Sequence, residues 1–224
     1  MKIVNANEKI ETILPKSQLN LYSYNAHFNF FKKIFEKKII PSTLLLTGAK
    51  GSGKATFAYH FINYLFSKNE KNKYSTKNFC IDKNNSSFKN VNENTHPNFF
   101  LIENTNLDKE IKIDQVRNLQ KFLNKSTYSM NLKVVLIDNI ENLNLNSSNA
   151  LLKSIEEPPN DTFFFLIHNN SRKVLDTVLS RCTKFKFFFT QDEKKNIFDN
   201  LIKQYDNTIK MKSYDENFHY DTPG

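Results

Sequence analysis

The sequence has few of the residues that build metal sites, disulfide frameworks and membrane spans. Its two cysteines, Cys80 and Cys182, form no CxxC pair, so neither a disulfide framework nor a cysteine zinc site is indicated. The histidines also lack metal-ligand spacing; they are His27, His60, His96, His168 and His219. No apolar run approaches the roughly 18 residues that a membrane span requires, and the N-terminus has no signal-peptide core. We therefore expect a soluble, cytoplasmic protein with no zinc and no membrane contact.

Arginine is scarce as well, since only three of the 32 basic residues are arginine: Arg117, Arg172 and Arg181. The formal net charge of +9 would suit nucleic-acid binding if the basic side chains were clustered, because they would then neutralise phosphates. Here the lysines are spread along the chain among abundant Asn, Ile and Phe, as AT-rich coding would produce. The charge is therefore weak evidence for nucleic acid, and the few arginines carry more information.

Glycine is the third scarce residue. Three of the four glycines lie within six residues, at Gly48, Gly51 and Gly53, and the fourth is Gly224. With Lys54 the three form GxxGxGK, the pattern of a phosphate-binding loop, in which backbone N–H groups and a helix N-terminus face the phosphates. A glycine turn that only joins two elements does not require this lysine. The predicted nucleotide contacts are Gly48, Gly51, Ser52, Gly53, Lys54, Ala55 and Thr56.

The rest of the chain alternates short apolar runs with amphipathic stretches. The runs predict five strands, at residues 43–47, 99–102, 133–138, 162–168 and 184–189. Helices are expected directly after the glycine loop, at residues 113–124, and before Pro158 and Pro159. Continuous apolar strands separated by helices indicate a mostly parallel sheet covered on both faces. We expect a three-layer α/β fold built on a five-stranded P-loop domain.

Two regions lie outside this alternation. Residues 67–98 are rich in Lys, Asn and Ser with few apolar anchors, which predicts a surface insertion or a mobile loop. From about Gln191 the pattern becomes helical again. The expected organisation is a nucleotide-binding-type domain at residues 1–188 and the start of a small helical lid domain at residues 189–224.

The predicted site departs from that of an active ATPase in two places. Asp138 follows a buried strand, where a carboxylate can hold the Mg²⁺ of a nucleotide directly or through water. However, Ala55 stands where Ser or Thr normally gives a hydroxyl to Mg²⁺, and Thr56 is rotated from that position by about 100°. Asn139 stands where active ATPases of this architecture usually carry a Glu that polarises the attacking water. We therefore expect ATP and Mg²⁺ binding that is weak or not followed by hydrolysis.

Three other carboxylates lie near these positions in the sequence. Glu141 is two residues beyond Asn139, so a different direction is open to its side chain. Glu156 and Glu157 sit at the end of a predicted helix, where a solvated face is the preferred interpretation. None of the three is predicted to take part in catalysis.

The segment from Asn149 to Cys182, NALLKSIEEPPNDTFFFLIHNNSRKVLDTVLSRC, resembles the clamp-loader branch of AAA+ proteins. Together with HPNFFLIE, IKIDQVRNLQ and KVVLIDNIENLN, it most resembles the delta-prime type of subunit in bacterial DNA polymerase III. The resemblance runs from about Thr43 to Phe187, with weaker agreement on either side. It implies an AAA+ fold and a place in a five-subunit assembly that opens the sliding clamp, places it on primed DNA and closes it.

The resemblance also implies roles for particular residues. Arg181 lies in the matched SRC motif and would act in trans as an arginine finger, pointed at ATP in a neighbouring motor subunit. Either Asn169 or Asn170 would be the polar sensor near the phosphate. The implied partners are the motor and delta-type subunits of the loader, with the sliding clamp contacted indirectly and primed DNA held within the complex.

Some features depart from the family pattern. Many members carry a four-cysteine zinc module after the first helix, which Cys80 alone cannot build. Clamp-loader subunits also continue into a helical collar domain, whereas this sequence stops at Gly224, so we expect a fragment. Arg117 is expected to be an ordinary exposed position, and Arg172 to face either the subunit interface or solvent, with solvent favoured.

Two alternative functions remain open from the sequence. The first is a self-sufficient ATPase, such as the tau or gamma type of motor subunit; Lys54 and Asp138 favour it, and Ala55 and Asn139 argue against it. The second is a nucleic-acid-binding module that uses the basic surface. Brisk ATP hydrolysis by the chain alone would favour the first, and salt-sensitive binding to DNA without partners would favour the second.

Overall fold

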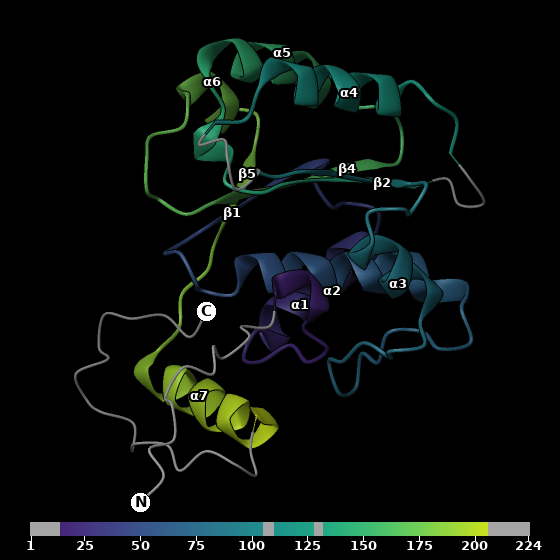
Figure 1. Ribbon diagram of the computed structural model, residues 1–224, viewed down its shortest axis with the longest axis vertical. Coiled ribbons are helices and arrows are strands. Elements are labelled where there is room, and N and C mark those ends of the chain that lie inside the picture. The colour runs from purple at the N-terminus through teal and green to yellow at the C-terminus, as the bar shows by residue number, and fades with distance from the viewer. Residues whose placement is uncertain (1–13, 105–109, 128–131, 206–224) are drawn as a thin grey trace, which may run out of the picture.

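The computed structural model describes residues 14–104, 110–127 and 132–205, and shows a five-stranded sheet between two helical layers (Figure 1). The strands are β1 (Thr43–Thr47), β2 (Phe99–Ile102), β3 (Lys133–Ile137), β4 (Thr162–His168) and β5 (Thr183–Lys186). Their order is β2-β3-β4-β1-β5, and all neighbouring pairs are parallel. The predicted three-layer α/β fold is confirmed.

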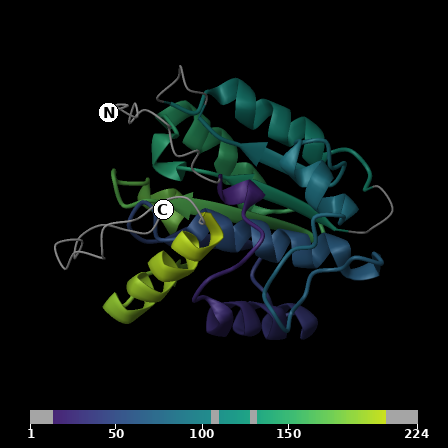
Figure 2. The same cartoon turned by 60° about the horizontal axis from the view of Figure 1, so that its bottom comes forward.

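Helices cover both faces of this sheet. One layer holds α1 (Asn25–Glu36), α2 (Lys54–Phe66) and α3 (Ser86–Asn92), and the other holds α4 (Ile113–Leu123), α5 (Leu145–Glu156) and α6 (Asp176–Leu179) (Figure 1). Single 3₁₀ turns occur at η1 (Pro15–Ser17), η2 (Ser67–Asn69) and η3 (Ile140–Asn142). The final described helix, α7 (Gln191–Tyr205), lies outside both layers in the two views (Figures 1 and 2).

The helix expected from about Gln191 is therefore present as α7. Its Ile197 is buried, with 5% of its surface exposed. The division of the chain into domains at residue 188 stays a prediction. In the described part of the chain, no helix combines the length and apolar character needed to cross a membrane.

The sheet is buried on both faces, and alternate residues of a strand enter different cores. Leu44 and Leu46 of β1 pack with α1 and α2, whereas Leu45 between them packs with α4 and α5. Because neither face meets water, each central strand is a continuous apolar run rather than an alternating one. That is why the sequence located β1, β3 and β4.

Two strands end earlier than predicted. Lys133–Ile137 forms β3, and the chain then turns because Asn139 takes the left-handed conformation with φ of 56°. At the end of β5, the Phe187 N–H still donates to the Thr47 carbonyl at 2.8 Å, but the next residues leave the sheet. Phe189 then stacks on another aromatic ring instead of extending the strand.

Aromatic rings fix α1 against α2. The Phe31 ring centroid lies 5.1 Å from that of Phe57 and 5.5 Å from that of Phe61, edge to face in both cases. Phe28 meets the same two rings edge to face, and all four side chains are fully buried. Edge-to-face pairs are favourable because the ring edge is positive and the ring face negative. This packing holds the helix that directly follows the glycine loop.

The segment at residues 67–98 is more ordered than its composition predicted. It forms η2 and α3 and contributes buried apolar side chains, namely Tyr74, Ile81 and Val91. The Glu70 carboxylate accepts hydrogen bonds from the N–H groups of Ser86 (2.9 Å) and Ser87 (3.0 Å) at the start of α3. Apolar and polar side chains thus fix this segment together, which suits the surface insertion rather than the mobile loop of the two expected forms.

A buried histidine ties this segment to the rest of the domain. His60 of α2 is fully buried, and its Nε2 donates to the Gln18 carbonyl at 3.1 Å. Since a carbonyl only accepts, Nδ1 is left to accept from the Tyr74 hydroxyl, also at 3.1 Å. Burial lowers the pKa of His60 to about 3, with the Gln18 hydrogen bond partly opposing the shift. The side chain is therefore neutral in the folded protein at physiological pH.

This histidine predicts a stability that falls in mild acid. A histidine in the unfolded chain takes up a proton below about pH 6.5, whereas folded His60 does so only near pH 3. The unfolded state therefore binds more protons in this window, and the free energy of unfolding should fall by about 2 kcal/mol between pH 7.5 and pH 5 from His60 alone. Urea unfolding at the two pH values measures it. His60→Gln should reduce the slope, and an unchanged slope would contradict the assignment.

Candidate functional site

The glycine loop joins the carboxyl end of β1 to the start of α2. Gly51 and Gly53 have φ of 77° and 75°, the left-handed region that favours glycine. Gly48 is needed for a different reason, because a Cβ there would lie 2.2 Å from the Phe187 carbonyl oxygen. All three glycines of the motif are thus required by backbone geometry, two by conformation and one by close approach.

Lys54, the first residue of α2, is folded back onto the loop. Its ammonium donates to the carbonyls of Gly48 (3.0 Å) and Ala49 (2.5 Å) and to Ser52 Oγ (3.2 Å). Only 2% of the residue is exposed. Burial lowers the pKa of Lys54 to about 8, while the charges of Asp138 and Glu141 oppose the shift. All three ammonium protons are used by the loop itself.

Two aromatic side chains cover the glycine loop, and the sequence did not reveal this contact. The Tyr24 hydroxyl donates to the Ser52 carbonyl at 2.6 Å, and the Tyr24 ring stacks on Phe189 with a centroid distance of 4.8 Å. A Cβ on Gly53 would lie 3.2 Å from both rings. The two aromatic residues come from segments far apart in the chain, and no motif marks either of them.

A pocket of about 240 Å³ lies beside the loop. Ligand pockets in proteins usually measure about 300–1,000 Å³, so this one is small for a nucleoside triphosphate. Of the residues predicted to bind nucleotide or metal, the lining includes Gly51, Gly53, Lys54, Ala55, Thr56, Asp138 and Asn169. It also includes Pro15, Lys50, Asn139 and Ile167. Gly48, Ser52, Asn170 and Arg181 are not part of it.

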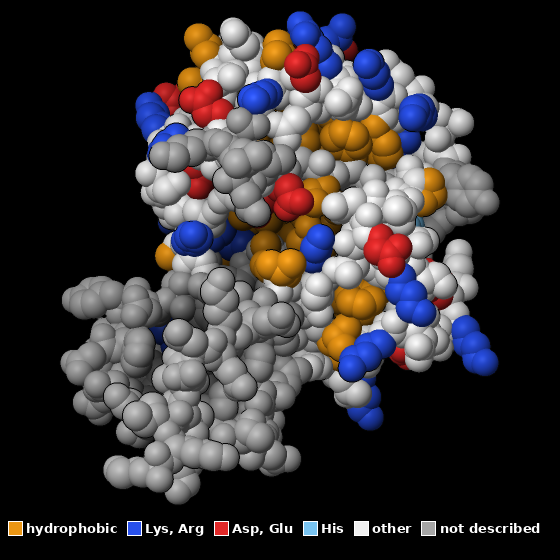
Figure 3. All heavy atoms as spheres, viewed as in Figure 1, with side chains coloured by type: hydrophobic (Ala, Val, Ile, Leu, Met, Phe, Trp, Pro, Cys, Tyr) orange, Lys and Arg blue, Asp and Glu red, His pale blue; other side chains and the backbone are white. Residues whose placement is uncertain are grey.

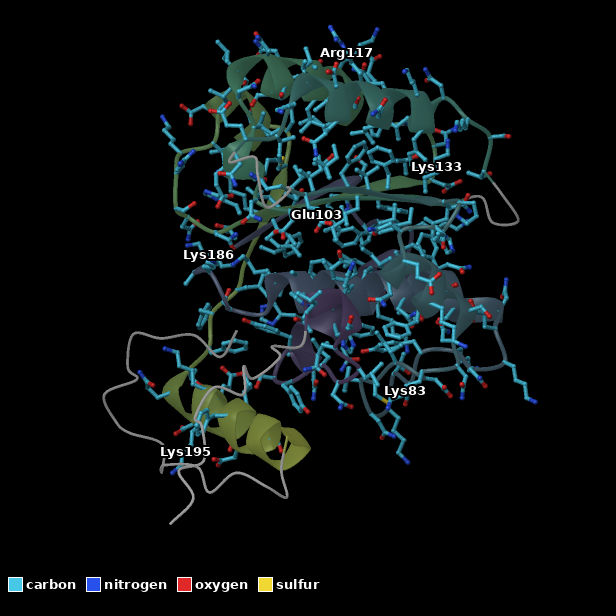
Figure 4. The ribbon with its side chains drawn as sticks, in the orientation of Figure 1. Lys83, Glu103, Arg117, Lys133, Lys186 and Lys195 are labelled. Carbon is cyan, nitrogen blue, oxygen red and sulfur yellow. The ribbon has the colours of Figure 1, made fainter. Side chains whose placement is uncertain are left out.

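Asp138 lies at the carboxyl end of β3, as predicted. Its N–H donates to the Ile102 carbonyl of β2 at 2.8 Å. Burial raises the pKa of the Asp138 carboxyl, and the nearby charges of Glu103 and Glu141 raise it further, against Lys54 and the Asn139 N–H. Glu103, which sequence reasoning did not single out, follows the end of β2 (Figure 4). Among the described residues, no group of three or more His, Cys, Asp or Glu side chains is arranged to hold a metal.

Glu141 holds the loop after β4. Only 7% of it is exposed. Its Oε1 accepts from the Asn169 N–H at 3.1 Å and from Ser171 Oγ at 2.8 Å. Asn169 Nδ2 in turn donates to Asn139 Oδ1. The Asn139 side-chain amide is therefore hydrogen-bonded to Asn169, which follows the neighbouring strand β4.

The two candidate sensor residues occupy different places. Asn169 lines the pocket. Asn170 has a left-handed φ of 57°, and its Oδ1 accepts a hydrogen bond from Thr47 Oγ1 at 2.7 Å. The sequence left the choice open because the two residues are identical and adjacent. The geometry favours Asn169 as the one that faces the pocket.

Arg181 lies apart from the pocket, between α6 and β5. Its Nε donates to Glu156 Oε1 at 2.6 Å, and its Nη1 donates to the Thr177 carbonyl at 2.7 Å. Glu156 is exposed at the end of α5, as expected, and the pairing with Arg181 adds a contact that the sequence did not indicate. Arg117 forms an exposed pair with Asp114 at 3.0 Å on α4 (Figure 4). Arg172 is exposed as well, so both match their expected exposure.

The fold and the loop define the class of protein: an α/β domain with a P-loop between β1 and α2. Among solved structures, it is similar to a DNA polymerase III gamma-subunit-related protein from Thermotoga maritima. That similarity has a TM-score of 0.55 and 20% sequence identity, and it covers 77% of this chain and 49% of the other. At this identity the likeness concerns the fold alone.

The sequence family follows from a match over most of the chain. The family described as "DNA polymerase III, delta subunit" matches residues 24–215, and this chain belongs to it. The DNA polymerase III subunit delta' of Bacillus subtilis is 30% identical over 175 residues, which is 75% of this chain and 48% of that protein. The delta' subunit of Pseudomonas aeruginosa is 42% identical over 90 residues, 40% of this chain and 27% of that protein. The chain thus spans less than half the length of these two relatives.

The close approach at Gly48 gives a direct stability test. Gly48→Ala places a methyl group on the Phe187 carbonyl, so the strand end must shift, and we expect a loss of about 1–3 kcal/mol in the free energy of unfolding. Ala49→Ser changes an exposed neighbour and should cost less than about 0.5 kcal/mol. Urea unfolding of both variants measures the difference. Equal stability of the two would show that the contact is unimportant.

Proposed function

We propose that this chain acts as a delta-prime-type subunit of the DNA polymerase III clamp loader. In that role it helps to load the sliding clamp onto primed DNA, together with motor and delta-type subunits. Its main chemical contribution is Arg181, offered in trans to ATP bound by a neighbouring motor subunit. The observation that carries this proposal is the position of Arg181: a guanidinium in the SRC motif, 34% exposed and outside the chain's own pocket.

Arginine suits this task better than the lysines that dominate the chain. A planar guanidinium donates two parallel hydrogen bonds to a phosphoryl group and stays charged at every physiological pH. Arginine fingers of this kind contribute about 10³ to 10⁵ in rate at the site they face. The position on a surface turn between α6 and β5 leaves the side chain accessible to a second subunit.

The chain's own loop fits a phosphate only in part. The glycine turn and Lys54 are of the right kind, but the ammonium is satisfied by three loop oxygens and would have to exchange them. Asp138 is the one predicted metal ligand, since Ala55 brings no hydroxyl and Asn139 is bonded to Asn169. Bound ATP and Mg²⁺ would supply charge for Lys54 and Asp138 to neutralise. We propose that any such binding is weak and not followed by hydrolysis.

The face of the molecule shown in Figure 3 does not favour the DNA-binding alternative. On the face shown in Figure 3, lysine and arginine side chains are scattered among acidic and uncharged ones rather than gathered in one patch. Nucleic-acid sites usually cluster their basic residues. In the proposed role, the chain reaches primed DNA as part of the assembly.

The trans role of Arg181 is tested in a loader reconstituted with a full-length version of this protein. Arg181→Ala should lower clamp-dependent ATP hydrolysis by about 10³ or more at the one site it faces, while the assembly elutes unchanged in size-exclusion chromatography. Single-turnover kinetics resolve that site from the others. Arg172→Ala, a nearby exposed arginine, is the matched control and should hydrolyse ATP normally. If Arg181→Ala leaves all rates intact within an assembled loader, the proposal fails.

The motor alternative is tested on the chain alone. Because Ala55 and Asn139 replace the groups for metal and water, we expect no ATP turnover above that of the Lys54→Ala variant. A coupled phosphate-release assay without partners measures it. Brisk hydrolysis that Lys54→Ala abolishes would identify the chain as a motor subunit instead.

A further inference from the structure

The contacts of Arg181 show where its guanidinium rests on its own chain. Nε donates to Glu156 Oε1, and Nη2 forms an ion pair with the same oxygen. Nη1 donates to the Thr177 carbonyl at 2.7 Å and to Ser180 Oγ at 3.3 Å. A guanidinium has five N–H donors in a fixed planar fork, so one donor at most stays free in this arrangement.

The fork is held at a junction of two elements. Glu156 is the last residue of α5, and Pro158 and Pro159 prevent the helix from continuing past it. Thr177 and Ser180 come from α6 and its C-cap. A cation at the carboxyl end of α5 is also favoured by the helix dipole. The resting place of the side chain thus combines the Thr177 carbonyl with two side chains, those of Glu156 and Ser180.

This arrangement conflicts with the role proposed for the same side chain. A phosphoryl group of a neighbouring ATP would take two parallel donors from the fork. The edge that combines Nε and Nη2 is occupied by Glu156, and Nη1 is occupied by Thr177 and Ser180. The guanidinium cannot hold Glu156 and a phosphoryl group along the same edge.

We propose that the Glu156 carboxylate holds the Arg181 guanidinium on its own chain, in what we call the parking contact, and that engagement of ATP in trans requires the guanidinium to leave this carboxylate. The inference rests on the proposed function of Arg181 and adds a competing intramolecular partner to it. The side chains of Arg181 and Glu156 are 34% and 43% exposed, so water screens the pair and its hold is modest. A triphosphate, with more negative charge than one carboxylate, displaces it, whereas an empty neighbouring site does not.

The next residue offers a matched control. Glu157 is also an exposed carboxylate, but it makes none of the contacts to Arg181 described above. Glu156→Gln and Glu157→Gln change the net charge equally and differ only in the parking contact. Any effect of Glu156→Gln beyond that of Glu157→Gln therefore reports on this contact.

The first arm of the test uses the isolated chain. It contains only three arginines, so its ¹⁵N spectrum has only three arginine Nε–Hε signals, and loss of one in Arg181→Lys assigns it. In Glu156→Gln we expect the Arg181 signal to shift and its exchange with water to quicken about two- to fivefold, with no change in Glu157→Gln. An Arg181 signal that is the same in all three proteins overturns the proposal.

The second arm uses the reconstituted loader and separates KM from kcat. Because parking competes with engagement, Glu156→Gln should lower the KM for ATP about two- to fivefold with kcat unchanged, and Glu157→Gln should match the wild type. A fall in kcat like that of Arg181→Ala would mean that Glu156 orients the finger, which overturns parking. If Arg181→Ala itself leaves hydrolysis intact, the proposed function fails, and the spectrum of the isolated chain still decides whether the parking contact exists.

Discussion

Burial of the sheet on both faces is the constraint on which the rest of this structure depends. Parallel strands must be joined by crossovers, and with both faces covered those crossovers are helices that return the chain to the same edge. Every strand therefore ends at one edge of the sheet. The glycine loop, Asp138 and Asn169 meet there because β1, β3 and β4 deliver them side by side.

At that edge the polar groups are satisfied mainly by one another. The Lys54 ammonium is bonded to the loop, Asn139 to Asn169, and Glu141 to the backbone that follows β4. A site that turns over ATP needs such groups aimed at the substrate and at the attacking water. Here these side chains instead form hydrogen bonds to the loop and to one another at the carboxyl ends of the strands. Arg181, whose side chain is 34% exposed, lies outside the pocket at a separate turn.

The sequence predicted the strands, the helices around them and the loop because each has a local physical signature. Continuous apolar runs mark strands buried on both faces, and three clustered glycines in a glycine-poor chain mark a backbone with special demands. Contacts between distant segments have no such signature. Tyr24 and Phe189 meet over the loop although 165 positions separate their numbers. The contact between Glu156 and Arg181 likewise joins two segments that no local pattern relates.

The composition of residues 67–98 left two forms open, a surface insertion and a mobile loop, for a related reason. Scarcity of apolar residues predicts little order only if apolar contacts are what fixes a segment. In this segment the Glu70 carboxylate and the Asn85 side-chain amide accept hydrogen bonds from backbone N–H groups at the start of α3. Hydrogen bonds to buried or half-buried polar groups thus supply the specificity that side-chain packing supplies elsewhere. Sequence statistics do not distinguish such a polar framework from a solvated loop.

The linker between β5 and α7 has a mechanical consequence. Its first residue places a carbonyl against Gly48, and Phe189, two positions later, stacks on the tyrosine that grips the loop through Ser52. The residues that lead into α7 are therefore in direct contact with the glycine loop and with the tyrosine that covers it. A change in the direction of α7 at the end of β5 would therefore be transmitted to the glycine loop through these contacts.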